Sequence, residues 1–180
     1  VEVRVNATEP FPMASVFKVP VIVEIMAQVR EGRFSLDDEI SLQPADLHLG
    51  SGILSGLDAP GITLAIRNLI KLMLQRSDNS ATDILFNLAG DNINARLRQN
   101  GIEGISVDRS CQHLIMDAIG LDFEAHRGLS LPDVIASYRK TLRENPKVAE
   151  KAQAEFSSIP KDQSTRLAMN VLLEKIFLTV

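Results

Sequence analysis

The sequence predicts a mainly α-helical protein with an N-terminal strand that belongs to an incomplete sheet. After Val16, apolar residues recur every three or four positions through most of the chain, which is the spacing of helices that bury one face. Residues 1–6 instead alternate as Val-Glu-Val-Arg-Val, which is the period of a half-buried strand. Because a lone strand cannot satisfy its own edges, we expect its sheet to be supplied by another chain or to have been cut away.

Start and stop signals divide the helical part into several expected helices. Glycines follow some of them, and Ser130 is followed by an early Pro and an Asp, as is typical of a helix start. The expected helices are residues 16–31, 63–76, 80–89, 92–100, 130–143, 146–156 and 166–177. Pro20 either belongs to the first turn of the first helix or bends it. Residues 39–42 and 104–107 are weak strand candidates.

Composition excludes several classes of partner. The 180 residues are 45% hydrophobic, so the chain can bury a core, and its length suits one domain or one domain and a piece of another. The formal net charge is −4 and no run rich in Lys and Arg stands out, so nucleic acid and anionic membranes are poor partners. No apolar run approaches the ~20 residues of a membrane helix. The single cysteine, Cys111, excludes an internal disulfide.

A candidate catalytic pair is Ser15-Val-Phe-Lys18, which lies at the start of the first expected helix. Side chains three residues apart share one helix face, so the lysine amine can reach the serine hydroxyl. A serine hydroxyl is a weak nucleophile until a base removes its proton, and a lysine can serve once burial lowers its pKa. Residues 137–140 and 158–161 match the same pattern without an apolar setting, so the motif alone is usually structural.

Ser77-Asp78-Asn79 is the second candidate motif, and it occurs at the break between two expected helices. On its own it is best interpreted as a helix cap, because Ser, Asp and Asn are the residues that start helices. Together with the Ser-x-x-Lys pair it favours a functional role, since penicillin-recognising enzymes carry both motifs in this order.

The chain resembles class A β-lactamases over more than these two motifs. Phe11-Pro-Met-Ala-Ser-Val-Phe-Lys-Val-Pro20 is similar to that family's nucleophile segment, and Leu49-Gly-Ser-Gly-Ile-Leu54 is similar to the loop that borders its cleft. Residues 63–82 resemble the helix that leads into the second motif and the motif itself. The likeness is continuous over about the first half of the chain, patchy to Arg109, and resumes near Asp162.

The resemblance implies a serine hydrolase that acts through an acyl-enzyme and uses no metal or cofactor. The matching residues carry over as Ser15 for the nucleophile, Lys18 for the proton acceptor or relay, and Ser77 for the shuttle of a proton toward the leaving nitrogen. Asn79 would hold the Lys18 amine or bind the side-chain amide of the substrate. The implied substrate is a β-lactam or a peptidoglycan-like amide, and the implied location is periplasmic or secreted.

One departure from the family concerns the base that would release the acyl group. The family places a glutamate soon after an Asp-Arg pair, whereas Asp108-Arg109 is followed by no acid at that spacing. Residues 117–161 are expected to be a long insertion that forms helices of its own. The side chains that could substitute for the base, although spacing supports none of them, are Glu124, Glu155, His113 and His126.

A second departure is the absence of the family's third motif, a Lys-Thr-Gly on a strand, before the chain stops at Val180. We therefore expect a fragment in which residues 1–14 end an α/β domain and residues 15–180 form the helical domain that carries both motifs. Such a fragment should be weakly active or inactive, because one oxyanion donor would be missing. It should also associate through exposed surface.

Two other functions are compatible with the sequence. One is a penicillin-binding or sensor-type protein that is acylated without efficient deacylation. The other is a non-catalytic interaction module, in which both motifs persist only as helix caps and packing. Covalent labelling by a penicillin separates the module from the first two, and release of the adduct separates those two from each other.

Overall fold

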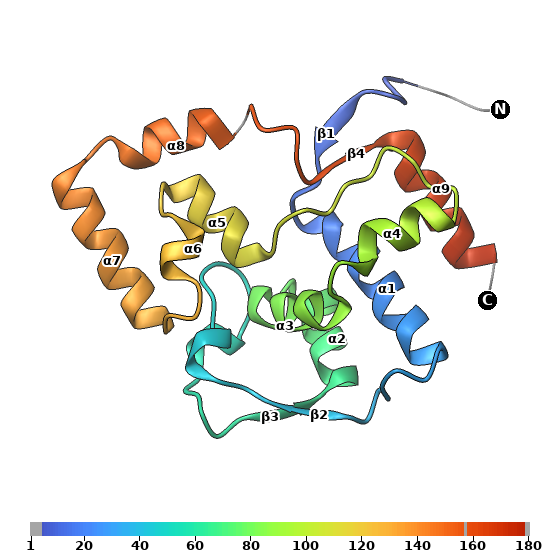
Figure 1. Cartoon of the computed structure of the whole chain (residues 1–180), viewed down its shortest axis with the longest axis horizontal. Coiled ribbons are helices and arrows are strands. Elements are labelled where there is room, and N and C mark those ends of the chain that lie inside the picture. Colours follow the sequence, from blue (N-terminus) through green and yellow to red (C-terminus); the bar gives the residue numbers. More distant parts are fainter. Residues whose placement is uncertain (1–4, 157, 179–180) are drawn as a thin grey trace.

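Helices dominate the computed structural model, which describes residues 5–156 and 158–178 (Figure 1). α3 lies at the centre and contacts α1, α2 and α5. α7 and α8 lie at one end of the molecule, and α1, α4 and α9 lie toward the other end (Figure 1). None of the helices described here is both long and apolar enough to cross a membrane. The mainly α fold class expected from the sequence is therefore confirmed.

The helices begin and end close to the positions that the sequence predicts. Those of the described residues are α1 (Lys18–Arg30), α2 (Ile66–Arg76), α3 (Asn79–Ala89), α4 (Asn92–Gln99), α5 (Cys111–Ile119), α6 (Phe123–His126), α7 (Leu131–Glu144), α8 (Val148–Phe156) and α9 (Arg166–Leu178). Each predicted helix is present within about a turn of its expected ends. Pro20 is the third residue of α1 and so belongs to its first turn, where its missing N–H costs nothing.

Two helices, α5 and α6, have no counterpart in the sequence prediction. The Ser110 side chain caps α5 by accepting a hydrogen bond from the His113 N–H, and Gly120 ends the helix in a left-handed conformation. Both signals are present in the sequence, and the apolar residues Cys111, Leu114, Ile115 and Ala118 recur at helical spacing, so the sequence carried a signal for this helix that the expected helices omit. α6 is a single turn, too short to produce a periodic pattern.

The described strands form two short antiparallel pairs. β1 (Pro10–Pro12) pairs with β4 (Gln163–Thr165), and β2 (Glu39–Ser41) pairs with β3 (Thr63–Ala65). The strand expected over residues 1–6 lies mostly outside the described residues, and its last two residues form a bend. The N-terminal strand that the structure does describe finds its partner within this chain, because the segment before α9 returns beside it.

One helix boundary and one strand prediction need correction. Residues 63–65 were expected to start a helix, but they form β3 against β2, and α2 begins only at Ile66. The candidate strand over residues 104–107 is reduced to one isolated bridge between Ile105 and Ser164. In both places the pairing partner is distant in sequence, so local periodicity carries no information about it.

The main core lies around α3, which is buried on its polar as well as its apolar positions. Ser80, Thr82 and Asp83 are each at most 1% exposed. The first half of α3, residues 79–85, has no face left for water, so each of these polar groups needs a partner inside the protein, whereas Asn87 in the second half is exposed. A smaller cluster at the α5–α7 end consists of Met116, Leu121 and Val134.

A buried ion pair fastens the segment that contains α5 to α8. Arg109 lies before this segment, Asp162 lies after it, and the two side chains are only 3% and 6% exposed. Arg109 Nε donates to Asp162 Oδ2 over 2.6 Å, and Arg109 Nη1 donates to Asp117 Oδ2 over 2.7 Å. Asp162 Oδ1 also accepts the backbone N–H of Asp108 at 2.7 Å. Both ends of the segment are thus held at one point.

We predict that Arg109→Ala lowers the free energy of unfolding by about 3 kcal/mol, because it leaves the Asp162 carboxylate buried without its cation. The matched control is Arg127→Ala, since Arg127 is 63% exposed in its pair with Glu124 and should contribute at most about 1 kcal/mol. Urea unfolding measures both changes. Equal effects of the two substitutions would contradict the anchoring role of Arg109.

Candidate active site

Ser15 and Lys18 lie where a single-turn 3-10 helix, η1 (Ala14–Phe17), runs into α1. Met13 and Phe17 are each 2% exposed and anchor this turn in the core, whereas Ser15 is exposed. Lys18 is the first residue of α1 and is only 3% exposed. The local fold therefore leaves the hydroxyl accessible to solvent and buries the amine.

The Lys18 amine donates hydrogen bonds to three oxygen atoms of the Ser77–Asn79 turn. Its Nζ lies 2.6 Å from the Ser77 carbonyl oxygen, 2.9 Å from Ser77 Oγ and 3.2 Å from Asn79 Oδ1. An ammonium group has three N–H donors, so each of them has an acceptor here. The contact expected between Lys18 and Asn79 is present.

Ser77 connects the buried amine to Ser15. Its hydroxyl accepts from Lys18 and donates to Ser15 Oγ over 3.0 Å. No direct hydrogen bond joins Lys18 to Ser15 in the described part of the chain, and the connection between them runs through Ser77. The physical reason is that α1 carries Lys18 into the core while Ser15 stays at the surface. The two groups are joined in two steps instead of one.

The backbone at Ser77 is strained. Its φ is 52°, in the left-handed region that costs a residue with a side chain about 1–2 kcal/mol. This conformation ends α2 at Ser77 and allows α3 to begin two residues later, with Asp78 as its cap. Such strain persists only where surrounding contacts over-determine it, and it is common at functional sites.

Asp78 supplies those contacts on one side of the turn. It is 1% exposed, and its Oδ1 accepts the Ala81 N–H of α3 at 3.0 Å. Its Oδ2 accepts the N–H groups of Ile53 at 2.7 Å and of Leu54 at 3.0 Å. The carboxylate therefore caps α3 and fastens the loop over residues 49–54 to the same point.

Two glycines allow that loop to lie directly against the turn. Gly50 and Gly52 have φ values of 98° and 125°, which side chains disfavour. A Cβ at Gly50 would lie 2.4 Å from Asn79 Nδ2, and a Cβ at Gly52 would lie 2.4 Å from the Asp78 carboxylate. Glycine is thus required at both positions by conformation and by space.

Burial sets the protonation of Lys18. It lowers the pKa of the amine below its ordinary value, because removal from water disfavours the charged form. The carboxylates of Asp83 and Asp78 oppose this shift through their charge. The Cys111 thiol stays neutral, because burial raises its pKa. A lysine with a lowered pKa is neutral at a lower pH than a solvated lysine, as a proton acceptor must be.

A second polar junction, around Asp83, was not singled out from the sequence. Asp83 Oδ1 accepts the Cys111 N–H at 2.6 Å, and Oδ2 accepts the Gln112 N–H at 2.8 Å, so this carboxylate of α3 holds the start of α5. His48 Nδ1 lies 2.8 Å from Asp83 Oδ2, which is an ion-pair distance, although the ring is not aligned for a hydrogen bond. The sequence signal that could have indicated this junction is the position of Asp83 next to the apolar Ile84 and Leu85 within the expected helix of residues 80–89.

The side chains considered as substitutes for a deacylation base lie elsewhere. Glu124 is 70% exposed on α6, and Glu155 is 67% exposed on α8. Glu124 pairs with Arg127 and Glu155 pairs with Lys151. His113 stacks on the Phe123 ring with its Nε2 3.5 Å from Asp117 Oδ2, and His126 contacts the Asp122 carbonyl. The structure does not bring any of the four into hydrogen-bond contact with the described atoms of Ser15, Lys18 or Ser77.

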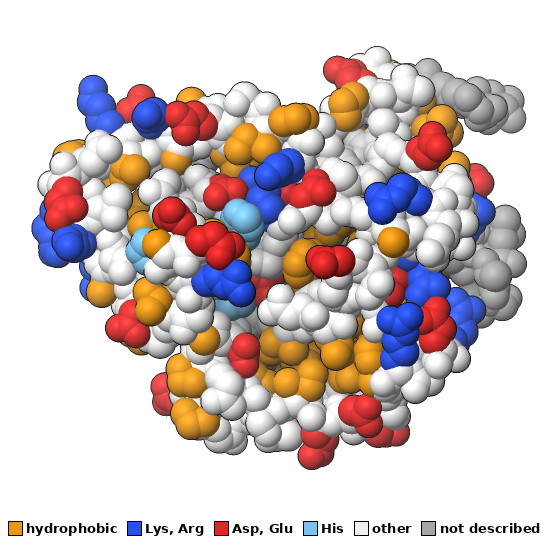
Figure 2. All heavy atoms as spheres, in the orientation of Figure 1, with side chains coloured by type: hydrophobic (Ala, Val, Ile, Leu, Met, Phe, Trp, Pro, Cys, Tyr) orange, Lys and Arg blue, Asp and Glu red, His pale blue; other side chains and the backbone are white. Residues whose placement is uncertain are grey.

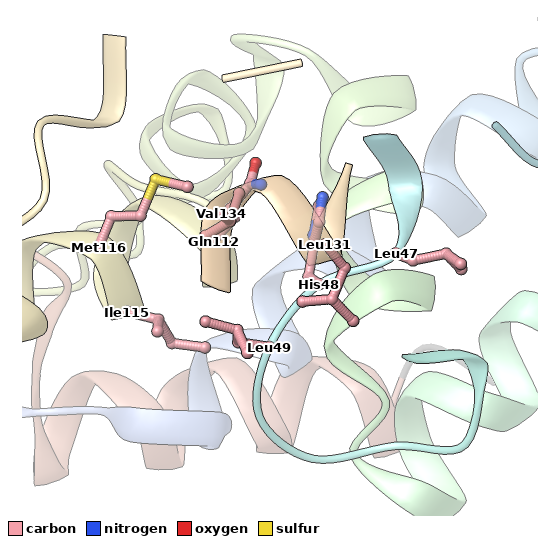
Figure 3. A pocket seen from close by; sticks show the side chains of 8 residues that line it. All are labelled: Leu47, His48, Leu49, Gln112, Ile115, Met116, Leu131 and Val134. Atoms are coloured by element: carbon pink, nitrogen blue, oxygen red, sulfur yellow. The ribbon is translucent and has the colours of Figure 1, made fainter. Parts of the chain in front are cut away.

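Two hollows lie beside α5, and neither is lined by Ser15, Lys18 or Ser77. One is an apolar cavity of about 10 Å³ between that loop, α5 and α7, with room for a single water (Figure 3). The other is an open polar hollow of about 410 Å³, lined in part by His48, Arg109 and His113.

Acidic and basic side chains alternate on the face shown in Figure 2, which therefore offers no continuous basic surface to nucleic acid.

Known proteins similar to this chain are β-lactamases. A family model described as "Beta-lactamase enzyme family" matches residues 1–174. Beta-lactamase VEB-1 from Pseudomonas aeruginosa is 28% identical over 117 residues, which cover 63% of this chain and 39% of that protein. A beta-lactamase from Bacteroides uniformis is 25% identical over 158 residues, covering 85% of this chain and 52% of that protein.

Solved structures agree on the fold. The structure of a beta-lactamase from Sphaerobacter thermophilus is 26% identical with a TM-score of 0.59, and the match covers 96% of this chain and 59% of that chain. An ancestral class A β-lactamase has a TM-score of 0.66 at 21% identity, with 98% of this chain and 53% of that chain covered. At that identity the likeness shows the fold alone.

The described architecture is thus the helical part of a class A β-lactamase fold. With the family model matched over nearly its whole length, the chain belongs to the beta-lactamase enzyme family. It spans about half the length, or less, of the two curated relatives named above, at 39% and 52%.

We predict that Gly50→Ala lowers the free energy of unfolding by about 1–3 kcal/mol, because it adds strain and pushes on Asn79. Gly56→Ala is the matched control, since a Cβ there meets nothing within 4 Å, and it should change stability by less than about 0.5 kcal/mol. Chemical denaturation of both variants provides the comparison. A Gly50→Ala protein as stable as the control would show that the loop is not held against the turn.

Proposed function

We propose that this chain carries the nucleophile half of a β-lactamase-like serine hydrolase, with Ser15 as the residue that is acylated. The observation that supports this most is the unbroken hydrogen-bonded path from Ser15 Oγ through Ser77 Oγ to Lys18 Nζ, over 3.0 and 2.9 Å. A hydroxyl at the surface linked to a buried amine is the arrangement that an activated serine needs. The substrate would be a β-lactam or a related amide.

The path supports a balanced first step. With Lys18 neutral, the Ser77 hydroxyl donates to the amine and accepts from Ser15, the reverse of the directions found with the ammonium. The Ser15 proton then passes to Ser77 Oγ while the Ser77 proton passes to the Lys18 amine. The Ser15 oxygen forms a bond to the amide carbonyl carbon, and the carbon–nitrogen bond of the amide then breaks. The leaving nitrogen takes back a proton from Lys18 through Ser77, so that an ester on Ser15 is left.

Asn79 is proposed to position the amine and the substrate. Its Oδ1 accepts from Lys18 at 3.2 Å, and its Nδ2 donates to the Leu49 carbonyl at 3.0 Å, which fixes the direction of the amide. A periplasmic or secreted location is part of the same proposal, because β-lactams act outside the cytoplasm. No step of the proposed reaction requires a metal or cofactor.

A second candidate function is that of a protein that is acylated and released slowly. The observation that favours it is that the two carboxylates near Lys18, those of Asp78 and Asp83, are already occupied by hydrogen bonds. Asp78 and Asp83 are each 1% exposed and already accept backbone N–H groups at both oxygens. Because both oxygens of each carboxylate already accept backbone N–H groups, neither carboxylate has a free oxygen directed at a water. The rate at which a penicillin adduct is lost separates this function from efficient hydrolysis.

We predict that a penicillin adds covalently to this chain, or to a longer protein that contains it, and that Ser15→Ala abolishes the adduct. Ser137→Ala is the matched control, because Ser137 begins another Ser-x-x-Lys sequence but lies within α7. Intact-mass measurement after prolonged incubation detects the adduct. An undiminished adduct in Ser15→Ala would sink the assignment, and no adduct in any form would favour a non-catalytic module.

We predict that acylation becomes faster as the pH rises and levels off once Lys18 is neutral. Because burial lowers the pKa of Lys18, the plateau should begin below the ordinary lysine value of about 10.4. Lys18→Arg should stay charged at every accessible pH and should therefore lose acylation throughout the range. The rate of adduct formation is measured from about pH 5 to about pH 10, because a lysine with a lowered pKa titrates within this range. A rate independent of pH would exclude Lys18 as the base.

A further inference from the structure

Ser51 contacts the same turn that holds Lys18, although it belongs to neither sequence motif. Its carbonyl oxygen accepts the Asn79 N–H at 2.9 Å. Its hydroxyl donates to the Ser77 carbonyl oxygen at 2.9 Å and lies 3.4 Å from Asn79 Oδ1. One residue of the 49–54 loop thus contacts both residues on whose oxygens the buried amine depends.

Ser51 and Lys18 share two acceptors. The Ser77 carbonyl oxygen receives Lys18 Nζ at 2.6 Å as well as the Ser51 hydroxyl, and Asn79 Oδ1 receives Lys18 Nζ at 3.2 Å as well as the longer contact from Ser51. Each oxygen has two lone pairs, so both donors can be accommodated. A hydrogen bond to a carbonyl draws electron density from its oxygen, which weakens the second hydrogen bond to the same oxygen.

The loop around Ser51 is built for this approach. Gly50 and Gly52 flank it, and a Cβ at either glycine would lie 2.4 Å from a side chain of the turn. The far end of the loop is fixed independently, because the Asp78 carboxylate accepts the N–H groups of Ile53 and Leu54. Ser51 is therefore held against the turn from both sides, and its hydroxyl does not need to order the loop.

We propose that Ser51 is a positioning residue of the acyl-transfer site. Its hydroxyl occupies part of the acceptor capacity of the Ser77 carbonyl and of Asn79 Oδ1, so that these oxygens hold the Lys18 amine in place without binding its ammonium form too strongly. The inference rests on the proposed function, in which Lys18 has to give up a proton before it can accept one from the serine path.

The direction of the effect follows from the contacts. Hydrogen bonds to the charged form of a group favour that form. Removal of the Ser51 hydroxyl leaves both oxygens free to bind the ammonium more strongly, so Lys18 should hold its proton to higher pH. The charged or titratable groups that act on Lys18 are Cys111 from α5, Asp83 from α3 and Asp78 at the start of α3, and none of them contacts the Ser51 hydroxyl.

The test is an NMR titration of Lys18 in this chain, with lysine labelled at Cε and the signal assigned through Lys18→Arg. Ser51→Ala should raise the titration midpoint by about 0.5 pH unit, or threefold in the proton-binding constant, as expected for one shared hydrogen bond. Ser51→Thr keeps the hydroxyl and should restore the original midpoint. Ser41→Ala removes a surface serine hydroxyl that pairs with Thr63, and it should leave the midpoint unchanged.

The outcomes separate this inference from the proposed function. An unchanged or lowered midpoint in Ser51→Ala overturns the role of Ser51, and so does an equal rise in Ser51→Thr. A raised midpoint that threonine restores supports it, since a merely structural defect would not be rescued in this way. If the chain forms no penicillin adduct while Lys18 titrates as expected, the proposed reaction fails but the coupling between Ser51 and Lys18 stands.

Discussion

The burial of one amine, that of Lys18, is the constraint on which the rest of the site depends. Lys18 is 3% exposed as a residue, so its ammonium group loses much of its contact with water, which costs several kcal/mol unless protein atoms replace it. Three oxygens of Ser77 and Asn79 make that replacement. They can do so only if α2 ends and α3 begins at a fixed place opposite α1. The positions of three helices are thereby tied to a single side chain.

The strained turn between α2 and α3 follows from the same requirement. Ser77 adopts a left-handed conformation that presents both its carbonyl and its hydroxyl oxygen to Lys18. The cost is offset by contacts around the turn, chiefly the Asp78 carboxylate and the loop with its two glycines. The buried amine therefore depends on the strained turn, and the turn depends on the glycine-containing loop. A change in any one of the three should alter the geometry of the other two.

Two carboxylates attach the α5–α8 segment to this arrangement. Asp83 holds the start of α5 on α3, and Asp162 receives Arg109 at the point where the segment begins and ends. Both carboxylates are buried, so their negative charge has to be matched by N–H groups or a cation. The segment contributes the buried Cys111, whose thiol stays neutral because burial raises its pKa, and it contributes no hydrogen bond to the amine. In this way an ion pair beside α5 supports the surroundings of the nucleophile.

The sequence by itself determined the helical fold class and the positions of α1 to α4 and α7 to α9, because capping and periodicity are local properties of the chain. The two motifs could also be identified from the sequence. The likeness of Phe11–Pro20 and the second motif to one family also came from sequence. Only the tertiary structure decided that Lys18 contacts Ser15 through Ser77, that residues 63–65 pair as a strand, and that Ser51 shares the acceptors of the amine. These contacts join residues far apart in the chain, and their geometry is set by how the helices pack. Spacing along the sequence cannot specify it.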